Sequence, residues 1–169
     1  MESIWIKEIK ADRNCVTYHL DVLEGLVRYF SPGCEMFAEF GFDISNIPKS
    51  VLAVPVLSNI MQFAWLFDCL VWIEEVDQQF YECLPKIKRG FQEMYRNYSF
   101  GGSLIAAKVV SNGYHAEKES ALLFTGGVDA TTSFLRIRDS NPVLIDTFGW
   151  CVDRDEESRV FEADISAIN

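Results

Sequence analysis

The stretch Ser120–Ser133, SALLFTGGVDATTS, constrains the fold of this chain more than any other. It begins with an apolar run, Ala121–Phe124, that has the length and character of a strand buried in a parallel sheet. A hydroxyl residue and two glycines follow, and the glycines supply the backbone freedom for a tight turn. The next residues, Asp129–Arg138, are compatible with a helix. We therefore predict a strand–turn–helix unit centred on the glycine pair.

The turn at this glycine pair would create a site for an anion. The N–H groups of Gly126, Gly127 and Val128 would lie at the helix N-terminus without partners in the helix, where the helix dipole favours negative charge. Asp129 and either of the two threonines after it are suitable first-turn and capping residues. The same residues could instead form only a capped strand-to-helix turn, because glycine pairs are common at such turns.

This loop resembles the pyrophosphate loop of the N-type ATP pyrophosphatases, the PP-loop superfamily. The superfamily pattern is Ser-Gly-Gly-x-Asp-Ser after the first strand. In this chain Thr125 stands for the first serine, Gly126, Gly127 and Asp129 match, and Ala130 replaces the last serine. The resemblance implies an α/β nucleotide-binding domain that begins with a β-α-β unit.

The resemblance also implies a chemistry, in which ATP is cleaved between its α- and β-phosphates, a substrate oxygen takes AMP, and pyrophosphate leaves. It assigns the pyrophosphate to Thr125, Gly126, Gly127 and Val128, with Thr131 replacing part of the hydroxyl function lost at Ala130. Mg²⁺ would be bound by Asp129. The nucleoside would be contacted by Asp146, at the end of the second predicted strand, Pro142–Asp146. The missing hydroxyl at Ala130 weakens the case for catalysis more than the case for ATP binding.

The chain before the loop predicts a separate α+β domain. The predicted strands are Ile4–Ala11, Cys15–Val22, Glu35–Asp43, Cys69–Glu75 and Leu104–Val110. The predicted helices run from about Pro48 to Leu66 and from Gln78 to about Tyr95, with Asp77 as a cap. We expect these helices to pack on a mostly antiparallel sheet. The predicted domains are residues 1–115 and an incomplete nucleotide-binding domain, residues 116–169.

Two features of the predicted helices concern how they would pack in the core. Pro55 should kink or divide the first helix. The second helix has apolar residues at helical spacing, which is typical of a face turned to the core. These residues are Phe80, Cys83, Leu84, Ile87, Phe91 and Met94. We also expect Cys69 and Cys83 to be small core groups.

A second resemblance concerns the region Ile47–Tyr95. In spacing and general character it is similar to the part that precedes the loop in bacterial proteins of the muropeptide L-glutamate epimerase group. No residue role follows from this similarity. It suggests that the acceptor of AMP would be an amino-acid or peptidoglycan-precursor carboxylate.

The composition limits which binding partners and which cellular compartment we expect for this chain. The net charge of −10 argues against a nucleic-acid surface, which needs clustered Lys and Arg. The most apolar run, Val51–Phe67, is too short and too interrupted for a membrane span, so we expect a buried helix and no membrane partner. Five widely spaced cysteines fit reduced thiols in a cytoplasmic protein better than disulfides.

The predicted nucleotide-binding domain is incomplete, since a doubly wound domain needs about five strands and two are predicted after Glu119. We therefore expect a fragment or truncated member, inactive alone, that forms a homo-oligomer or lacks a C-terminal part. The expected function is ATP-binding, substrate-adenylating activity of the PP-loop type. The alternative is a non-enzymatic interaction module with a degenerate phosphate loop.

Overall fold

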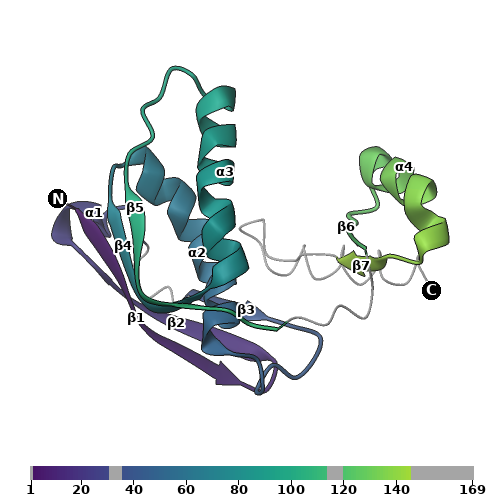
Figure 1. The fold of residues 1–169 in the computed structure, drawn as a ribbon, viewed down its shortest axis with the longest axis horizontal. Helices are drawn as coiled ribbons and strands as arrows, with labels where there is room; N and C mark the ends of the chain where they lie inside the picture. The colour runs from purple at the N-terminus through teal and green to yellow at the C-terminus, as the bar shows by residue number, and fades with distance from the viewer. Residues whose placement is uncertain (1, 31–35, 114–119, 146–169) are drawn as a thin grey trace. The chain divides into compact units, whose positions relative to one another are not determined.

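The computed structural model describes residues 2–30, 36–113 and 120–145. The chain divides into two compact units, an N-terminal unit, Met1–Gly113, and a C-terminal unit, Tyr114–Asn169 (Figure 1). The assignment of residues 1–115 and 116–169 as two domains stays a prediction.

The N-terminal unit contains a mixed five-stranded sheet in the order β3-β2-β1-β4-β5. The strands are β1 (Ser3–Asp12), β2 (Cys15–Val22), β3 (Met36–Glu39), β4 (Leu70–Asp77) and β5 (Ser103–Val110). β1–β2 and β2–β3 are antiparallel, whereas β1–β4 and β4–β5 are parallel. The predicted α+β class with a mostly antiparallel sheet is therefore wrong. The unit is α/β in character, because each long helix returns the chain to start the next strand in the same direction.

Three helices accompany this sheet: α1 (Glu24–Val27), α2 (Lys49–Leu66) and α3 (Gln78–Met94). The connections β1→β4 and β4→β5 step across the sheet in one direction, so right-handed crossovers place α2 and α3 on the same face. Both helices contact β4, β5 and each other, as Figure 1 shows. One face of the sheet is thus covered by helices.

The core lies between α2 and this face of the sheet. Its fully buried side chains include Ile4, Val16, Leu57, Met61 and Val71. α2 has the length and hydropathy of a membrane span, and half of its residues are buried inside the unit. Pro55 was predicted to kink or divide this helix; a division is wrong, since α2 is continuous through the proline, and a kink stays a prediction. Proline removes only one hydrogen bond of the helix, and the surrounding turns keep theirs.

The opposite face of the sheet carries a pair of tryptophans. Because Ile4, Ile6, Val71 and Ile73 are buried, alternation along the strands turns Trp5 and Trp72 to the other side. These two residues are in register on β1 and β4, and their rings stack with centroids 5.3 Å apart. Trp5 is 42% exposed, so no described helix covers this face around it.

The helix α3 is less buried than its apolar spacing predicts. Leu84 is its one buried residue, while Cys83, Ile87 and Met94 are exposed. The prediction of a core role is wrong for these three residues and correct for Cys69, which is buried. The described neighbours of α3 are β4, the edge strand β5 and α2, and of the residues of this helix they bury only Leu84.

The C-terminal unit contains the predicted β-α-β arrangement. β6 (Ala121–Leu123) and β7 (Val143–Ile145) pair in parallel, and α4 (Val128–Ile137) connects them, followed by a short 3-10 helix, Arg138–Ser140. The prediction of a buried strand is wrong, because none of residues 120–145 is buried and Leu123 is 65% exposed. Within residues 120–145, two strands and one helix do not cover the other faces of these elements.

Candidate functional site

The glycine pair forms the predicted turn between β6 and α4. Gly126 has a φ of +72°, a left-handed conformation that glycine adopts readily. Gly127 is the N-cap residue, with φ −68° and ψ 167°, and α4 begins at Val128. No side chain caps this helix N-terminus. The predicted turn Gly126–Val128 is therefore confirmed as a local structure.

The first backbone N–H groups of α4 lie outside the hydrogen bonds of the helix. The first bond of the helix runs from the Thr131 N–H to the Gly127 carbonyl, 2.9 Å. The N–H groups of Val128, Asp129 and Ala130 therefore have no acceptor within the helix. The N–H groups of Gly126, Gly127 and Val128 were predicted to bind the anion, whereas those of Asp129 and Ala130 were missed, because the helix begins at Val128, one residue earlier than predicted.

The space above the glycines is open. A Cβ atom at Gly126 would meet nothing within 4 Å, and one at Gly127 would have the Thr125 hydroxyl as its nearest neighbour, at 3.6 Å. Residues from Thr125 to Asp129 are all exposed. An anion could approach the loop without displacing a described side chain.

Two side chains flank the loop. The Thr131 hydroxyl donates to the Gly126 carbonyl at 3.5 Å, which is at the limit of a hydrogen bond and places this hydroxyl beside the loop. The Asp129 carboxylate lies in the first turn of α4 and makes no ion pair with the residues that the structure describes. Asp146, the predicted nucleoside contact, lies outside the described residues.

A metal ion at this loop would have few protein ligands. Among residues 2–30, 36–113 and 120–145, no group of three or more His, Cys, Asp or Glu side chains could hold a metal. Mg²⁺ commonly binds through one or two carboxylates together with phosphate oxygens and water. Asp129 alone fits that pattern, with a metal that arrives with its phosphates.

A buried polar cluster lies at the carboxyl ends of β4 and β5, where open parallel sheets often bind ligands. Asp77 caps α3 by accepting from the Phe80 N–H at 2.9 Å, and its other oxygen accepts from the Asn112 amide at 2.9 Å. The same amide nitrogen donates to Ser50 in the first turn of α2, at 3.0 Å. These bonds tie two helix N-termini to two strand ends, which is a structural role. The cap at Asp77 was predicted, whereas Asn112 and Ser50 were missed.

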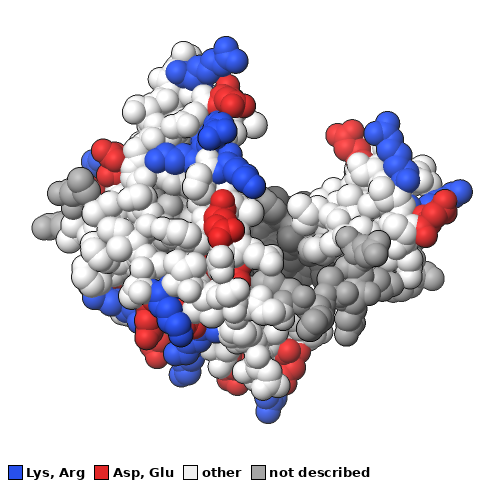
Figure 2. Space-filling model, in the orientation of Figure 1, with Lys and Arg blue, Asp and Glu red and all other residues white. Residues whose placement is uncertain are grey.

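The second glycine pair, Gly101-Gly102, also has a structural role. Gly102 has a φ of +60°, and a Cβ there would run into the backbone carbonyl groups of Ala64 and Cys69. Its N–H donates to the Asp68 carboxylate at 2.6 Å, and its carbonyl accepts from Lys88 at 3.0 Å. Figure 2 shows the Lys and Arg side chains over α3 next to Asp and Glu side chains.

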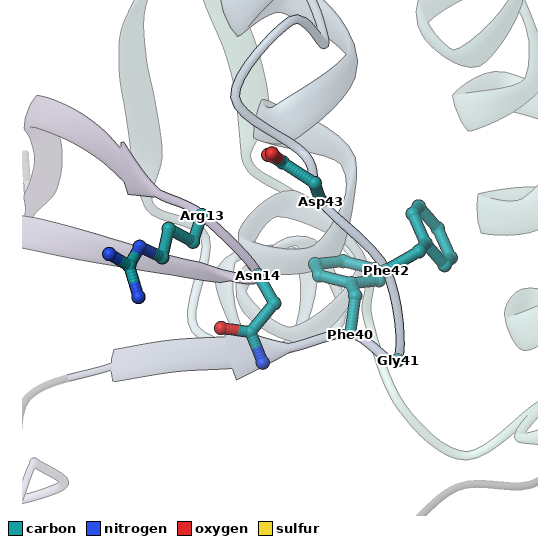
Figure 3. A pocket seen from close by; sticks show the side chains of 6 residues that line it. All are labelled: Arg13, Asn14, Phe40, Gly41, Phe42 and Asp43. Atoms are coloured by element: carbon teal, nitrogen blue, oxygen red, sulfur yellow. The ribbon is translucent and has the colours of Figure 1, made fainter.

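A pocket of about 410 Å³ lies beside the turn between β1 and β2. Arg13 and Asn14 come from this turn, and Phe40, Gly41, Phe42 and Asp43 come from the segment after β3 (Figure 3). Two backbone bonds hold the segments together, from the Phe40 N–H to the Asn14 carbonyl and from the Ile44 N–H to the Arg13 carbonyl, 2.8 and 2.6 Å. The predicted strand Glu35–Asp43 therefore ends at Glu39, and the residues after it line a pocket.

Comparison with known proteins gives no match. No protein family, curated protein or solved structure is significantly similar to the chain. The resemblances to the PP-loop superfamily and to the muropeptide L-glutamate epimerase group therefore stay predictions made from the residues.

Proposed function

We propose that the loop Thr125–Asp129 binds the phosphates of ATP, and that the chain belongs to a substrate-adenylating protein of the PP-loop type. The acceptor of AMP would be an amino-acid or peptidoglycan-precursor carboxylate. One observation carries the proposal. A left-handed glycine and an N-cap glycine open α4 with no capping side chain, and β6 and β7 on either side of α4 are parallel.

The chemistry of the loop residues supports this proposal. The N–H groups of Val128, Asp129 and Ala130 converge at the positive end of a helix dipole, which suits a phosphate group. The Thr125 and Thr131 hydroxyl groups would donate to its remaining oxygens. The Asp129 carboxylate by itself would repel a bare phosphate, so we expect binding of a phosphate that carries Mg²⁺.

A titration with ATP and with pyrophosphate, each with and without Mg²⁺, tests the proposal on the full chain. The informative variant is Gly127→Ala, because an alanine adopts the φ of −68° without strain and its Cβ has room in the free protein. The methyl group would occupy the space proposed for the phosphate. We expect the variant to fold normally and to bind Mg²⁺–pyrophosphate at least about tenfold more weakly.

The matched control is Val128→Ala, which keeps the backbone N–H and changes a side chain that is 83% exposed. Its affinity should equal that of the wild-type chain. Asp129→Asn should lower the dependence of binding on Mg²⁺. Equal affinity of the wild-type chain and Gly127→Ala would contradict a phosphate role for the loop.

The second candidate function is a non-enzymatic interaction module with a degenerate loop. The absence of any buried residue among residues 120–145 favours it, because such strands need a partner to cover them. A pyrophosphate-release assay together with sedimentation distinguishes the two functions. Association without nucleotide binding would favour the interaction module.

A further inference from the structure

The pocket beside the β1–β2 turn presents two unpaired charges of opposite sign. The Arg13 guanidinium and the Asp43 carboxylate make no ion pair with any residue of 2–30, 36–113 or 120–145. The hydrogen bonds from Ser45 lower the pKa of the Asp43 carboxyl below its usual value, so this group is ionised at neutral pH. One Asp43 oxygen accepts from the Ser45 N–H at 2.8 Å, and Asp43 is exposed to solvent.

An aromatic surface accompanies these charges. The rings of Phe40 and Phe42 contact each other with centroids 5.7 Å apart, and Phe42 is 62% exposed. Gly41 lies between them in sequence, and a Cβ atom there would meet nothing within 4 Å, so the backbone between the two phenylalanines borders open space. Exposed aromatic rings next to free charges of both signs are typical of a binding surface rather than of a core.

We propose that this pocket binds a small zwitterion, an α-amino acid with an aromatic side chain. In Figure 3 the Arg13 side chain extends away from Phe42, so it would turn toward the pocket to bind the carboxylate of the ligand. Asp43 would bind its ammonium group, and Phe40 and Phe42 would contact its ring. The volume of about 410 Å³ is within the range of small-molecule sites. This site lies within the N-terminal unit and is independent of the function proposed for the glycine loop.

The test is an NMR titration of the full chain with three probes: L-phenylalanine, phenethylamine, which lacks the carboxylate, and 3-phenylpropionate, which lacks the ammonium group. We expect all three to shift the amide signals of Gly41 and Phe42, with L-phenylalanine binding most tightly. Because both charges are exposed, each should contribute about a two- to fivefold gain in affinity.

Two variants assign the charges. Arg13→Gln should weaken the binding of L-phenylalanine and 3-phenylpropionate but not that of phenethylamine. Asp43→Asn should weaken the binding of L-phenylalanine and phenethylamine but not that of 3-phenylpropionate. Asparagine keeps an oxygen for the Ser45 N–H, and the Arg13 backbone bond does not depend on its side chain. A misfolded variant would bind none of the three probes, so this crossed pattern distinguishes the loss of one charge from a loss of the fold.

The controls are Lys10→Gln and Asp12→Asn, which make the same charge changes on β1 outside the pocket lining. They should leave all three affinities unchanged. Failure of L-phenylalanine to shift Gly41 and Phe42 at concentrations up to about 10 mM would overturn the proposal. Equal weakening of the binding of every probe by Arg13→Gln and Asp43→Asn, in variants whose other amide signals match those of the wild-type chain, would overturn it as well.

Discussion

The two units use parallel strands joined by a helix in very different surroundings. In the N-terminal unit, β1, β4 and β5 lie in a five-stranded sheet under α2, and residues such as Val71 and Leu57 are fully buried. In the C-terminal unit, β6 and β7 have the same parallel pairing and no buried residue between 120 and 145. A β-α-β unit is thus a local structure, whereas a core requires further strands on its edges.

The largest expected effect comes from shortening a leucine in each unit. Leu57→Ala in α2 removes a fully buried side chain and should lower the free energy of unfolding by about 2–5 kcal/mol. Leu123→Ala in β6 removes a largely exposed side chain and should change it by less than about 0.5 kcal/mol. Urea unfolding with hydrogen exchange of peptides from each unit measures both. A large loss at Leu123 would show that the strand is covered in solution.

Substitutions of the two left-handed glycines, Gly102 and Gly126, test the same difference between the two units. Gly102→Ala adds backbone strain and a clash with the carbonyl groups of Ala64 and Cys69, so it should cost about 3 kcal/mol or more. Gly126→Ala adds strain alone, because its Cβ would lie in open space, and should cost about 1 kcal/mol. Thermal unfolding of both variants measures the difference, and equal losses would mean that the loop at Gly126 is packed against something.

A smaller effect than that of Leu57→Ala is expected for another buried group of the N-terminal unit, the Tyr18 hydroxyl. Its buried hydroxyl donates to the Leu52 carbonyl at 2.9 Å, so Tyr18→Phe should cost about 1 kcal/mol at neutral pH. Burial, with a smaller effect of Cys15, raises the pKa of Tyr18 above its usual value of 10.0. A raised pKa means that this stabilisation is present below pH 10 and is lost as the pH rises further. The stability difference between wild type and Tyr18→Phe should therefore shrink above pH 10 in urea titrations, and a constant difference would contradict the shift.

Features set by neighbouring residues could be predicted from the sequence. The β1–β2 hairpin, the cap at Asp77 and the turn at Gly126-Gly127 depend on residues a few positions apart, and all three are confirmed. The strand order and the parallel pairing of β4 depend on where distant segments meet, and the sequence contains no direct signal of that.

The burial of side chains on α3 and the polar cluster of Asp77, Ser50 and Asn112 could not be predicted, because both also depend on where distant segments meet. Cys83 and Leu84 have equivalent apolar surroundings in sequence, yet Cys83 is exposed and Leu84 is buried, because consecutive helical residues point in different directions and the neighbouring elements cover only one side of α3. Asn112 meets Ser50 and Asp77 from far along the chain, so spacing alone gave no reason to connect them. The pocket at Arg13 and Asp43 also joins two segments that are separate in sequence.

The stacked pair of Trp5 and Trp72 gives this fold a built-in optical signal. The two indoles meet only when β1 pairs with β4, which closes the longest loop between adjacent strands of the sheet. Two stacked chromophores couple electronically, so their near-ultraviolet circular dichroism should differ from that of separate tryptophans. Because closing a long loop is a slow, entropically costly step, the appearance of this signal during refolding would time the formation of the parallel half of the sheet.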